Sequence, residues 1–208
     1  MKLDLEKWSL VILGNWNTSI LSPNWLSNEI LHVKKLTIQF PVLGGGSPLF
    51  GTENMAIIVK PNKLTFAPIS SEDDTLVKIE QAAKSVLEKL SYTPIKAFGQ
   101  NFHFVVSKEE MPKQCEEIFN LSDDEKISVK GEVLETSIIR SIKIDSAVLN
   151  LKIEKNEHCH ISLNYHYVVN KAEEAVALIS NTFIKNKKHG LDLLRDVYGL
   201  ELEEETSV

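Results

Sequence analysis

Apolar and polar residues alternate along much of this chain, and the alternation is clearest over residues 158–169. Successive side chains of a β-strand point to opposite faces of the sheet. One face of this segment would therefore be apolar and aromatic, and the other would carry His158, His160, Ser162, Asn164 and His166. Comparable patterns predict further strands at 8–13, 36–40, 54–59, 64–69, 95–106, 127–144 and 147–153.

Other segments repeat their apolar residues at helical spacing. The pattern predicts a long helix over 72–90 and a second over 108–121. A shorter helix is expected to start at Ser22 as N-cap, with Pro23 in its first turn. Towards the end of the chain, one apolar stripe covers 172–183 and another covers 191–198, with Gly190 between them.

One short motif occurs twice. Asn-Phe-His-Phe-Val-Val begins at Asn101, and Asn-Tyr-His-Tyr-Val-Val begins at Asn164. Each copy is followed by a helix-capping signal, so the chain is expected to contain two similar units of aromatic strand and amphipathic helix. The similarity does not extend upstream of the motif, and chance remains the alternative explanation.

These elements predict an α+β fold built on an antiparallel sheet of about seven to eight strands. Strands follow one another with hairpin-length connections, which favours antiparallel pairing over a doubly wound parallel sheet. The helices are expected on the aromatic face, because that packing buries the most apolar area. Residues 1–208 are expected to form one domain, and two packed halves, 1–121 and 122–208, are the alternative.

Composition narrows the classes of partner. The net charge is −6, and Arg140 and Arg195 are the only arginines, which argues against nucleic-acid binding. No segment has the run of about 18 apolar residues that a membrane span needs, so no membrane partner is expected. Cys115 and Cys159 do not form a Cys-x-x-Cys motif, and a reduced, cytoplasmic protein without a cofactor is the expectation.

The polar side of the two motif strands is the candidate binding surface. Its predicted residues are Asn101, His103, His160, Asn164 and His166. A metal site is a weaker hypothesis, because His158 and His166 would lie ~26 Å apart along one strand, and no metal ligand is assigned. Trp16, flanked by Asn15 and Asn17, is a further candidate, either lining a ligand pocket or sealing one end of the sheet.

The sequence therefore favours a non-enzymatic binding or assembly subunit. It is expected to bind a second copy of itself, or another protein, through the polar face of the sheet. The alternative is a small-molecule-binding or metal-dependent enzyme that uses the same histidines and asparagines. Neither cysteine is a convincing nucleophile, since both fall on the apolar side of their predicted elements.

Overall fold

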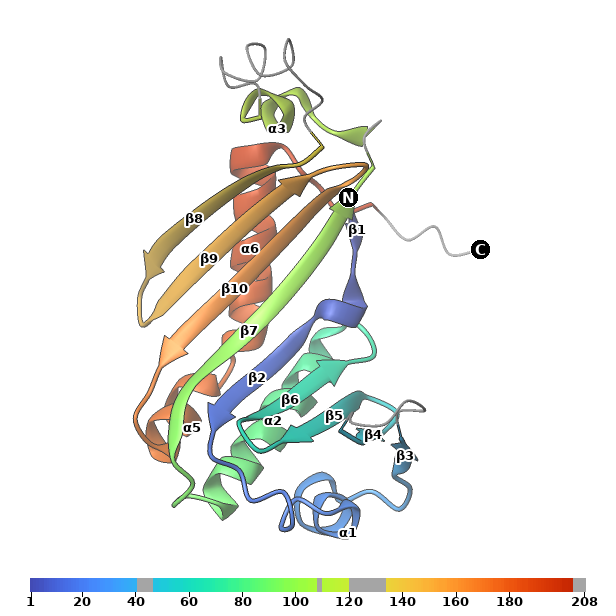
Figure 1. Ribbon diagram of the computed structural model, residues 1–208, viewed down its shortest axis with the longest axis vertical. Coiled ribbons are helices and arrows are strands. Elements are labelled where there is room, and N and C mark those ends of the chain that lie inside the picture. The colour runs from blue at the N-terminus through green and yellow to red at the C-terminus, as the bar shows by residue number, and fades with distance from the viewer. Residues whose placement is uncertain (41–46, 108–109, 120–133, 204–208) are drawn as a thin grey trace.

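The computed structural model describes residues 1–40, 47–107, 110–119 and 134–203, and its strands form one large antiparallel sheet (Figure 1). The sheet has 10 strands in the order β3-β4-β5-β6-β2-β7-β10-β9-β8, with β1 paired to β7. This confirms the predicted α+β class and antiparallel pairing. The strand number is higher than the predicted seven to eight, because β1 and β4 are too short to produce an alternating pattern. The strands are β1 (Lys2–Leu3), β2 (Ser9–Gly14), β3 (Thr37–Gln39), β4 (Leu49–Gly51), β5 (Met55–Lys60), β6 (Lys63–Pro68), β7 (Ile95–Val106), β8 (Thr136–Ile144), β9 (Ala147–Lys155) and β10 (Cys159–Val168).

The long helices lie behind the sheet in Figure 1, all on one of its faces. The described helices are η1 (Leu5–Lys7), α1 (Pro23–Trp25), η2 (Leu26–Leu31), α2 (Asp73–Lys89), α3 (Lys113–Glu117), α5 (Ala172–Ile179) and α6 (Thr182–Tyr198). The predicted cap at Ser22 is present, since its hydroxyl accepts a hydrogen bond from the Trp25 N–H at 3.4 Å. No helix in the described ranges is long and apolar enough to cross a membrane.

The C-terminal helices divide at a different place from the predicted one. The chain turns at Asn181, whose φ is 58°, and α6 then runs without interruption through Gly190. Residues 127–133 of the strand expected over 127–144 lie outside the described residues. Of the helix expected over 108–121, residues 108–109 and 120–121 also lie outside them, and α3 covers only Lys113–Glu117.

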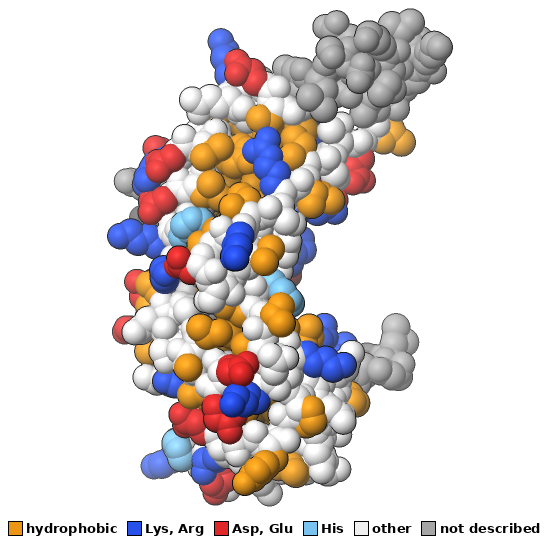
Figure 2. All heavy atoms as spheres, turned by 90° about the vertical axis from the view of Figure 1, so that its left-hand side faces the viewer, with side chains coloured by type: hydrophobic (Ala, Val, Ile, Leu, Met, Phe, Trp, Pro, Cys, Tyr) orange, Lys and Arg blue, Asp and Glu red, His pale blue; other side chains and the backbone are white. Residues whose placement is uncertain are grey.

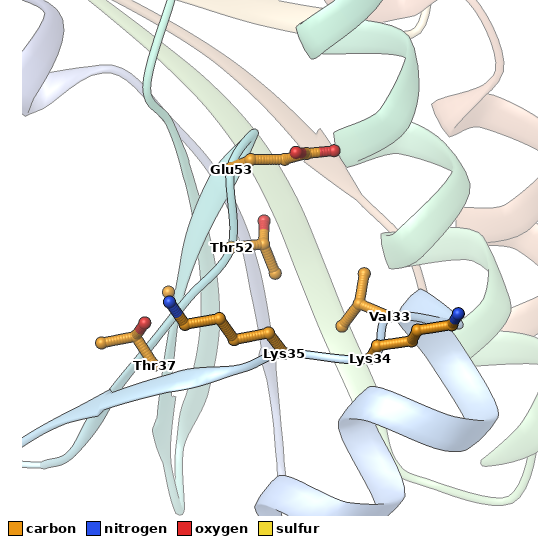
Figure 3. A pocket seen from close by; sticks show the side chains of 7 residues that line it. Val33, Lys34, Lys35, Thr37, Thr52 and Glu53 are labelled. Atoms are coloured by element: carbon orange, nitrogen blue, oxygen red, sulfur yellow. The ribbon is translucent and has the colours of Figure 1, made fainter.

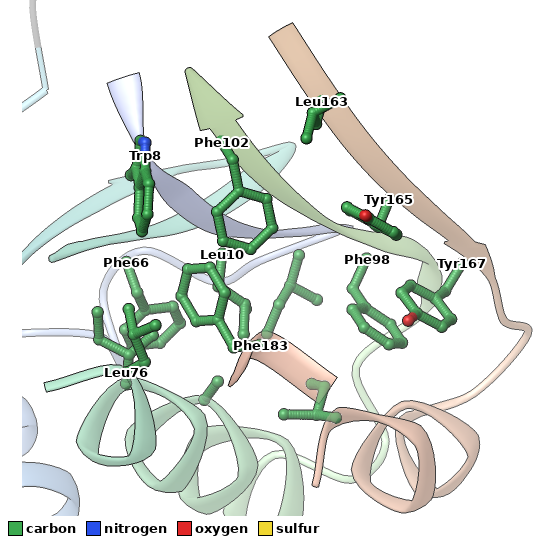
Figure 4. Packing of buried hydrophobic residues seen from close by; sticks show 14 of the residues in the cluster. Trp8, Leu10, Phe66, Leu76, Phe98, Phe102, Leu163, Tyr165, Tyr167 and Phe183 are labelled. Atoms are coloured by element: carbon green, nitrogen blue, oxygen red, sulfur yellow. The ribbon is translucent and has the colours of Figure 1, made fainter. Parts of the chain in front are cut away.

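The core lies between the sheet and the helix layer and is rich in aromatic rings (Figure 4). Phe102 is fully buried and meets Trp8 edge to face, with ring centroids 4.9 Å apart. Phe98 and Tyr167 stack at 4.4 Å. The predicted assignment of faces is therefore confirmed: the motif strands turn their rings toward the helices.

The two motif strands, β7 and β10, are immediate neighbours in the sheet. They pair antiparallel, with Asn101 opposite Asn164 and His103 opposite Ser162. The two copies thus share the same pair of environments, aromatic toward the helices and small or polar on the other side. That shared environment is a physical reason for their similarity, and a common strand-helix unit stays a prediction.

The strand order also contains a broader symmetry. Outward from the central β2–β7 pair, one side reads β6, β5, β4 and the other reads β10, β9, β8. In chain order, one side consists of β2, the short helices α1 and η2, strands β3 to β6, and the long helix α2. The other side consists of β7, the short helix α3, strands β8 to β10, and helices α5 and α6. On each side the outer strands return toward the centre. One cluster of buried hydrophobic residues runs beneath both sides.

The end of α6 gives a test of local backbone geometry. Gly199 has φ +66°, and its N–H donates to the Arg195 carbonyl at 3.0 Å. Gly199→Ala is expected to lower the free energy of unfolding by about 1–2 kcal/mol, because a Cβ is disfavoured in this left-handed conformation. The new methyl group would also meet the Gln114 side chain.

Urea denaturation of the Gly199 variant measures this loss, and Gly51→Ala is the matched control. A Cβ at Gly51 would make only ordinary contacts, the nearest at 3.8 Å. Equal stability of the two variants would contradict the proposed role of Gly199.

Candidate binding face of the sheet

One whole face of the sheet is left uncovered by the described helices. In Figure 1 this open face is turned toward the viewer, with α2, α5 and α6 behind the sheet. Figure 2 views the molecule from the β8 side, and its outline is hollowed on the side of the open face. The open face is therefore an accessible and inward-curved surface, on which the two motif strands lie near the middle.

A continuous hydrogen-bonded chain of side chains crosses the centre of the open face. Asn101 Nδ2 donates to Ser9 Oγ at 3.0 Å, and Asn164 Nδ2 donates to Asn101 Oδ1 at 2.7 Å. Asn150 Nδ2 donates to Asn164 Oδ1 at 3.3 Å, and Ser141 Oγ donates to Asn150 Oδ1 at 2.8 Å. We call these five residues the amide row. Because each amide is held by its neighbours, the row presents a fixed pattern of polar groups across strands β2, β7, β10, β9 and β8.

His103 and His160 lie beside the amide row, toward the N-terminal end of β10. His103 Nδ1 is 3.0 Å from Ser162 Oγ. Burial, and secondarily the charge of Lys7, lowers the pKa of His103, so this imidazole is neutral at pH 7. A cavity of about 340 Å³ opens here, lined by Asp4, Lys7, His103, Phe104, Glu154, Asn156, His160 and Ser162.

His166 lies at the other end of the open face, directly opposite Gly99. It is six positions from His160, which corresponds to ~20 Å along the strand. Gly99 leaves room for the row, since a Cβ there would come within 3.1 Å of Asn164 Nδ2. The structure thus brings together Asn101 with Asn164, and His103 with His160, but places His166 apart from both histidines.

Trp16 lies away from these five residues. The residue is 3% exposed, and its Nε1 donates to the Ile12 carbonyl at 3.3 Å. Its backbone N–H donates to the Pro61 carbonyl at 2.8 Å, which ties the end of β2 to the β5–β6 turn. This position is that of a core residue at one end of the sheet and offers no ring surface to a ligand.

The chemistry available on the open face is hydrogen bonding. Within the described ranges, no three His, Cys, Asp or Glu side chains gather closely enough to hold a metal ion. The two cysteines are buried, and the hydrogen bond with Cys115, together with burial, raises the pKa of the Cys159 thiol. Cys159 is therefore a protonated thiol at neutral pH and an ineffective nucleophile.

A second cavity lies at the opposite end of the sheet, near β3 (Figure 3). It measures about 420 Å³ and is lined by Val33, Lys34, Lys35, Thr37, Gly51, Thr52 and Glu53. Figure 3 shows Lys34 and Lys35 pointing in different directions, so their ammonium groups do not converge on one ligand position.

Sequence reasoning missed three members of the amide row: Ser9, Asn150 and Ser141. Asn150 could have been found, because it lies on the polar side of an alternating strand and the β9–β10 hairpin places it opposite Asn164. Ser141 could have been found in the same way, because the two-residue β8–β9 turn places it opposite Asn150. Ser9 could not, because its strand β2 pairs with β7, which is distant in the sequence.

Comparisons with other proteins give no further guide to this surface. No protein-family model matches the chain, and a search of curated proteins found no match. The functional proposal therefore rests on the geometry of the open face.

Proposed function

We propose that this chain is a non-enzymatic binding or assembly subunit that self-associates through the open face. The amide row carries the proposal. Five short side chains are fixed by hydrogen bonds across five strands, at the centre of a face that no described helix covers. Such short, ordered and uncharged groups allow another surface to approach closely, whereas long charged side chains would hold it away.

The low charge at the centre of the open face favours burial in an interface. Neutral amides and hydroxyls cost less to desolvate than ions, provided that they keep hydrogen-bond partners. The amide row already satisfies much of its own hydrogen bonding, and the lowered pKa keeps His103 uncharged. Covering this region would therefore carry a smaller electrostatic penalty than covering a face of lysines and glutamates.

The shape of a twisted sheet supports a second copy as the partner. Twist gives a sheet a saddle shape, which curves in opposite directions along its two diagonals. A saddle fits an identical saddle turned over by a two-fold axis in the interface, and sheets packed face to face with nearly aligned strands are a known arrangement. The open face is thus compatible with the isologous contact of a symmetric dimer.

The alternative function is a small-molecule-binding enzyme, and the cavity beside His103 and His160 is the observation that favours it. Its lining includes a neutral imidazole bonded to a hydroxyl, together with carboxylates and a lysine. The charges are partly neutralised within the protein, because Lys7 pairs with Asp4 at 2.7 Å. This leaves the binding-subunit proposal as the stronger one.

Sedimentation velocity of the wild type and of Asn101→Lys tests the proposal. The wild type is expected to associate, and the variant is expected to raise the dissociation constant at least ~10-fold, because it puts an ammonium group at the centre of the interface. Ala177→Lys, on an exposed position of α5, is the matched control and should associate as the wild type does.

Native mass spectrometry adds an independent reading of metal content. A monomeric wild type that carries one zinc ion would refute the proposal in favour of the enzyme alternative. Association that Asn101→Lys leaves unchanged would also refute the open face as the interface, provided that circular dichroism shows both proteins to be folded.

A further inference from the structure

The sheet ends at β8 in a long strand whose outer edge has no partner among the described residues. Thr136–Ile144 pairs with β9 on its inner side only. Its nine residues form an edge ~30 Å long and include no proline. The opposite edge strand, β3, has only three residues. Long unprotected edges are templates for pairing with another strand, so the two ends of this sheet differ in their capacity to extend it.

Hydrophobic side chains surround the β8 edge. Ile139 is 68% exposed on the open-face side. Ile138, Ile142 and Ile144 are only partly buried on the α6 side, as is Leu191 of α6 itself. Figure 2 looks onto this edge and shows hydrophobic side chains gathered in the upper half of the view. The edge therefore combines unpaired backbone groups with apolar surface.

We propose that β8 pairs antiparallel with β8 of a second copy of this chain, around a two-fold axis at Ile139. The pairing would join the two sheets into one. This interface is separate from the open face and does not depend on the function proposed for that face.

Backbone geometry restricts which residues can pair. The β8–β9 hairpin has a two-residue turn between Ile144 and Ala147. Residues flanking such a turn exchange hydrogen bonds, and the pattern alternates along the strand. The backbone N–H and C=O groups of the even-numbered residues of β8 therefore bond to β9. Those of residues 137, 139, 141 and 143 point outward, away from β9. A two-fold axis at Ile139 places outward-directed residues opposite one another.

Charge selects this register among those that the backbone allows. With the axis at Ile139, Lys143 lies opposite the partner's Glu135. By symmetry, Glu135 lies opposite the partner's Lys143. Lys143 has no ion-pair partner among the described residues, and both side chains are exposed. An axis at Arg140 would instead oppose two guanidinium groups, and an axis at Ser141 would place Lys143 opposite the partner's Ile139 without pairing Glu135.

The size of the contact is compatible with a stable dimer. An edge ~30 Å long and about 20 Å deep, counting the sheet and the helix behind it, presents on the order of 600 Å² per copy. Both copies together would bury about 1,200 Å², the lower end of the range for specific interfaces.

Cross-linking of Ile139→Cys tests the register directly. Opposed residues of a hydrogen-bonded antiparallel pair have Cα atoms ~5.5 Å apart, a separation that suits a disulfide. With oxidised glutathione as oxidant, the two opposed thiols are expected to form one disulfide and yield a covalent dimer on a non-reducing gel. Cys115 and Cys159 are buried and should not compete.

Lys143→Cys is the matched control for the cross-link. It is exposed on the same strand, but its symmetry mate would lie ~26 Å away, eight residues along the pair, so no covalent dimer is expected. Equal cross-linking of the two variants, or none with Ile139→Cys, would overturn the proposed register.

Ile139→Pro tests the pairing itself by sedimentation velocity. Proline lacks an N–H, and at an outward-directed position of an edge strand it leaves the β8–β9 hydrogen bonds in place. The variant is expected to keep the wild-type circular dichroism spectrum and to raise the dimer dissociation constant at least ~10-fold. Ile139→Ala is the control that keeps the N–H.

Comparison with Asn101→Lys separates this interface from the open face. If Ile139→Pro weakens association and Asn101→Lys does not, the β8 pairing stands and the function proposed for the open face fails. The reverse result overturns the β8 pairing alone. A wild type that remains monomeric at all concentrations overturns both.

Discussion

Replacing Phe102 by alanine is expected to lower the free energy of unfolding by about 3–5 kcal/mol. The Phe102 ring is fully buried and meets three others, with centroid distances of 4.9 Å to Trp8, 5.3 Å to Phe183 and 5.9 Å to Tyr165. The substitution would leave a cavity where the sheet, η1 and α6 meet. Urea denaturation followed by tryptophan fluorescence measures the loss as a shift of the midpoint.

His103→Ala is the matched control for Phe102, because the two residues are adjacent in β7 and point to opposite faces. The histidine is only partly buried and would lose its hydrogen bond with Ser162, a net effect of about 0.5–1.5 kcal/mol. Equal destabilisation by the two substitutions would contradict the assignment of faces on which the functional proposal rests.

The second large effect is expected at Glu80, a carboxylate of α2 that is only 4% exposed. Its Oε2 accepts a hydrogen bond from the Asn181 N–H at 2.8 Å, and its Oε1 accepts one from the Phe183 N–H at 2.6 Å. Glu80 thus caps the start of α6 from a different helix. Glu80→Ala would leave these donors unpaired and is expected to cost about 3 kcal/mol.

Glu80 is also expected to make the free energy of unfolding depend on pH in a definite direction. Burial raises the pKa of Glu80 above its ordinary value of 4.5, although hydrogen bonds from the backbone of Phe183 and Asn181 oppose the shift. The folded protein therefore binds the Glu80 proton more tightly than the unfolded chain does. The resulting stabilisation is fully present below pH 4.5 and is lost as the pH rises through the raised pKa.

Glu80→Gln isolates this contribution from that of other carboxylates. The free energy of unfolding of the wild type, minus that of Glu80→Gln, is expected to fall as the pH rises above 4.5. A difference that is constant with pH, or that rises, would contradict the direction of the shift. Equilibrium denaturation at a series of pH values provides the measurement.

The sequence predicted the strands that alternate and the faces to which the side chains of the two motif strands point. Phe102 and Tyr165 lie in the core, and Asn101 and Asn164 lie on the open face, as the two-residue period requires. The short strands β1 and β4 were missed because two or three residues cannot establish a period.

The division of the C-terminal helices shows why local signals can mislead. The sequence pattern places Gly190 between two apolar stripes, at 172–183 and 191–198, whereas α6 runs through it. In the structure it permits α6 to approach β10, because a Cβ at Gly190 would come within 2.6 Å of the Leu163 side chain. The actual break at Asn181 is held by Glu80, about 100 residues earlier in the chain.

By itself the sequence determined the α+β class, the alternation of faces and the polar character of the motif strands, because these follow from local periodicity. Only the tertiary structure decided that β7 and β10 are neighbours, that Ser9 completes the amide row, that Trp16 is buried, and that β8 forms an open edge. Each of these depends on which strands lie side by side. Strand order is set by packing between distant segments, and no short-range pattern encodes it.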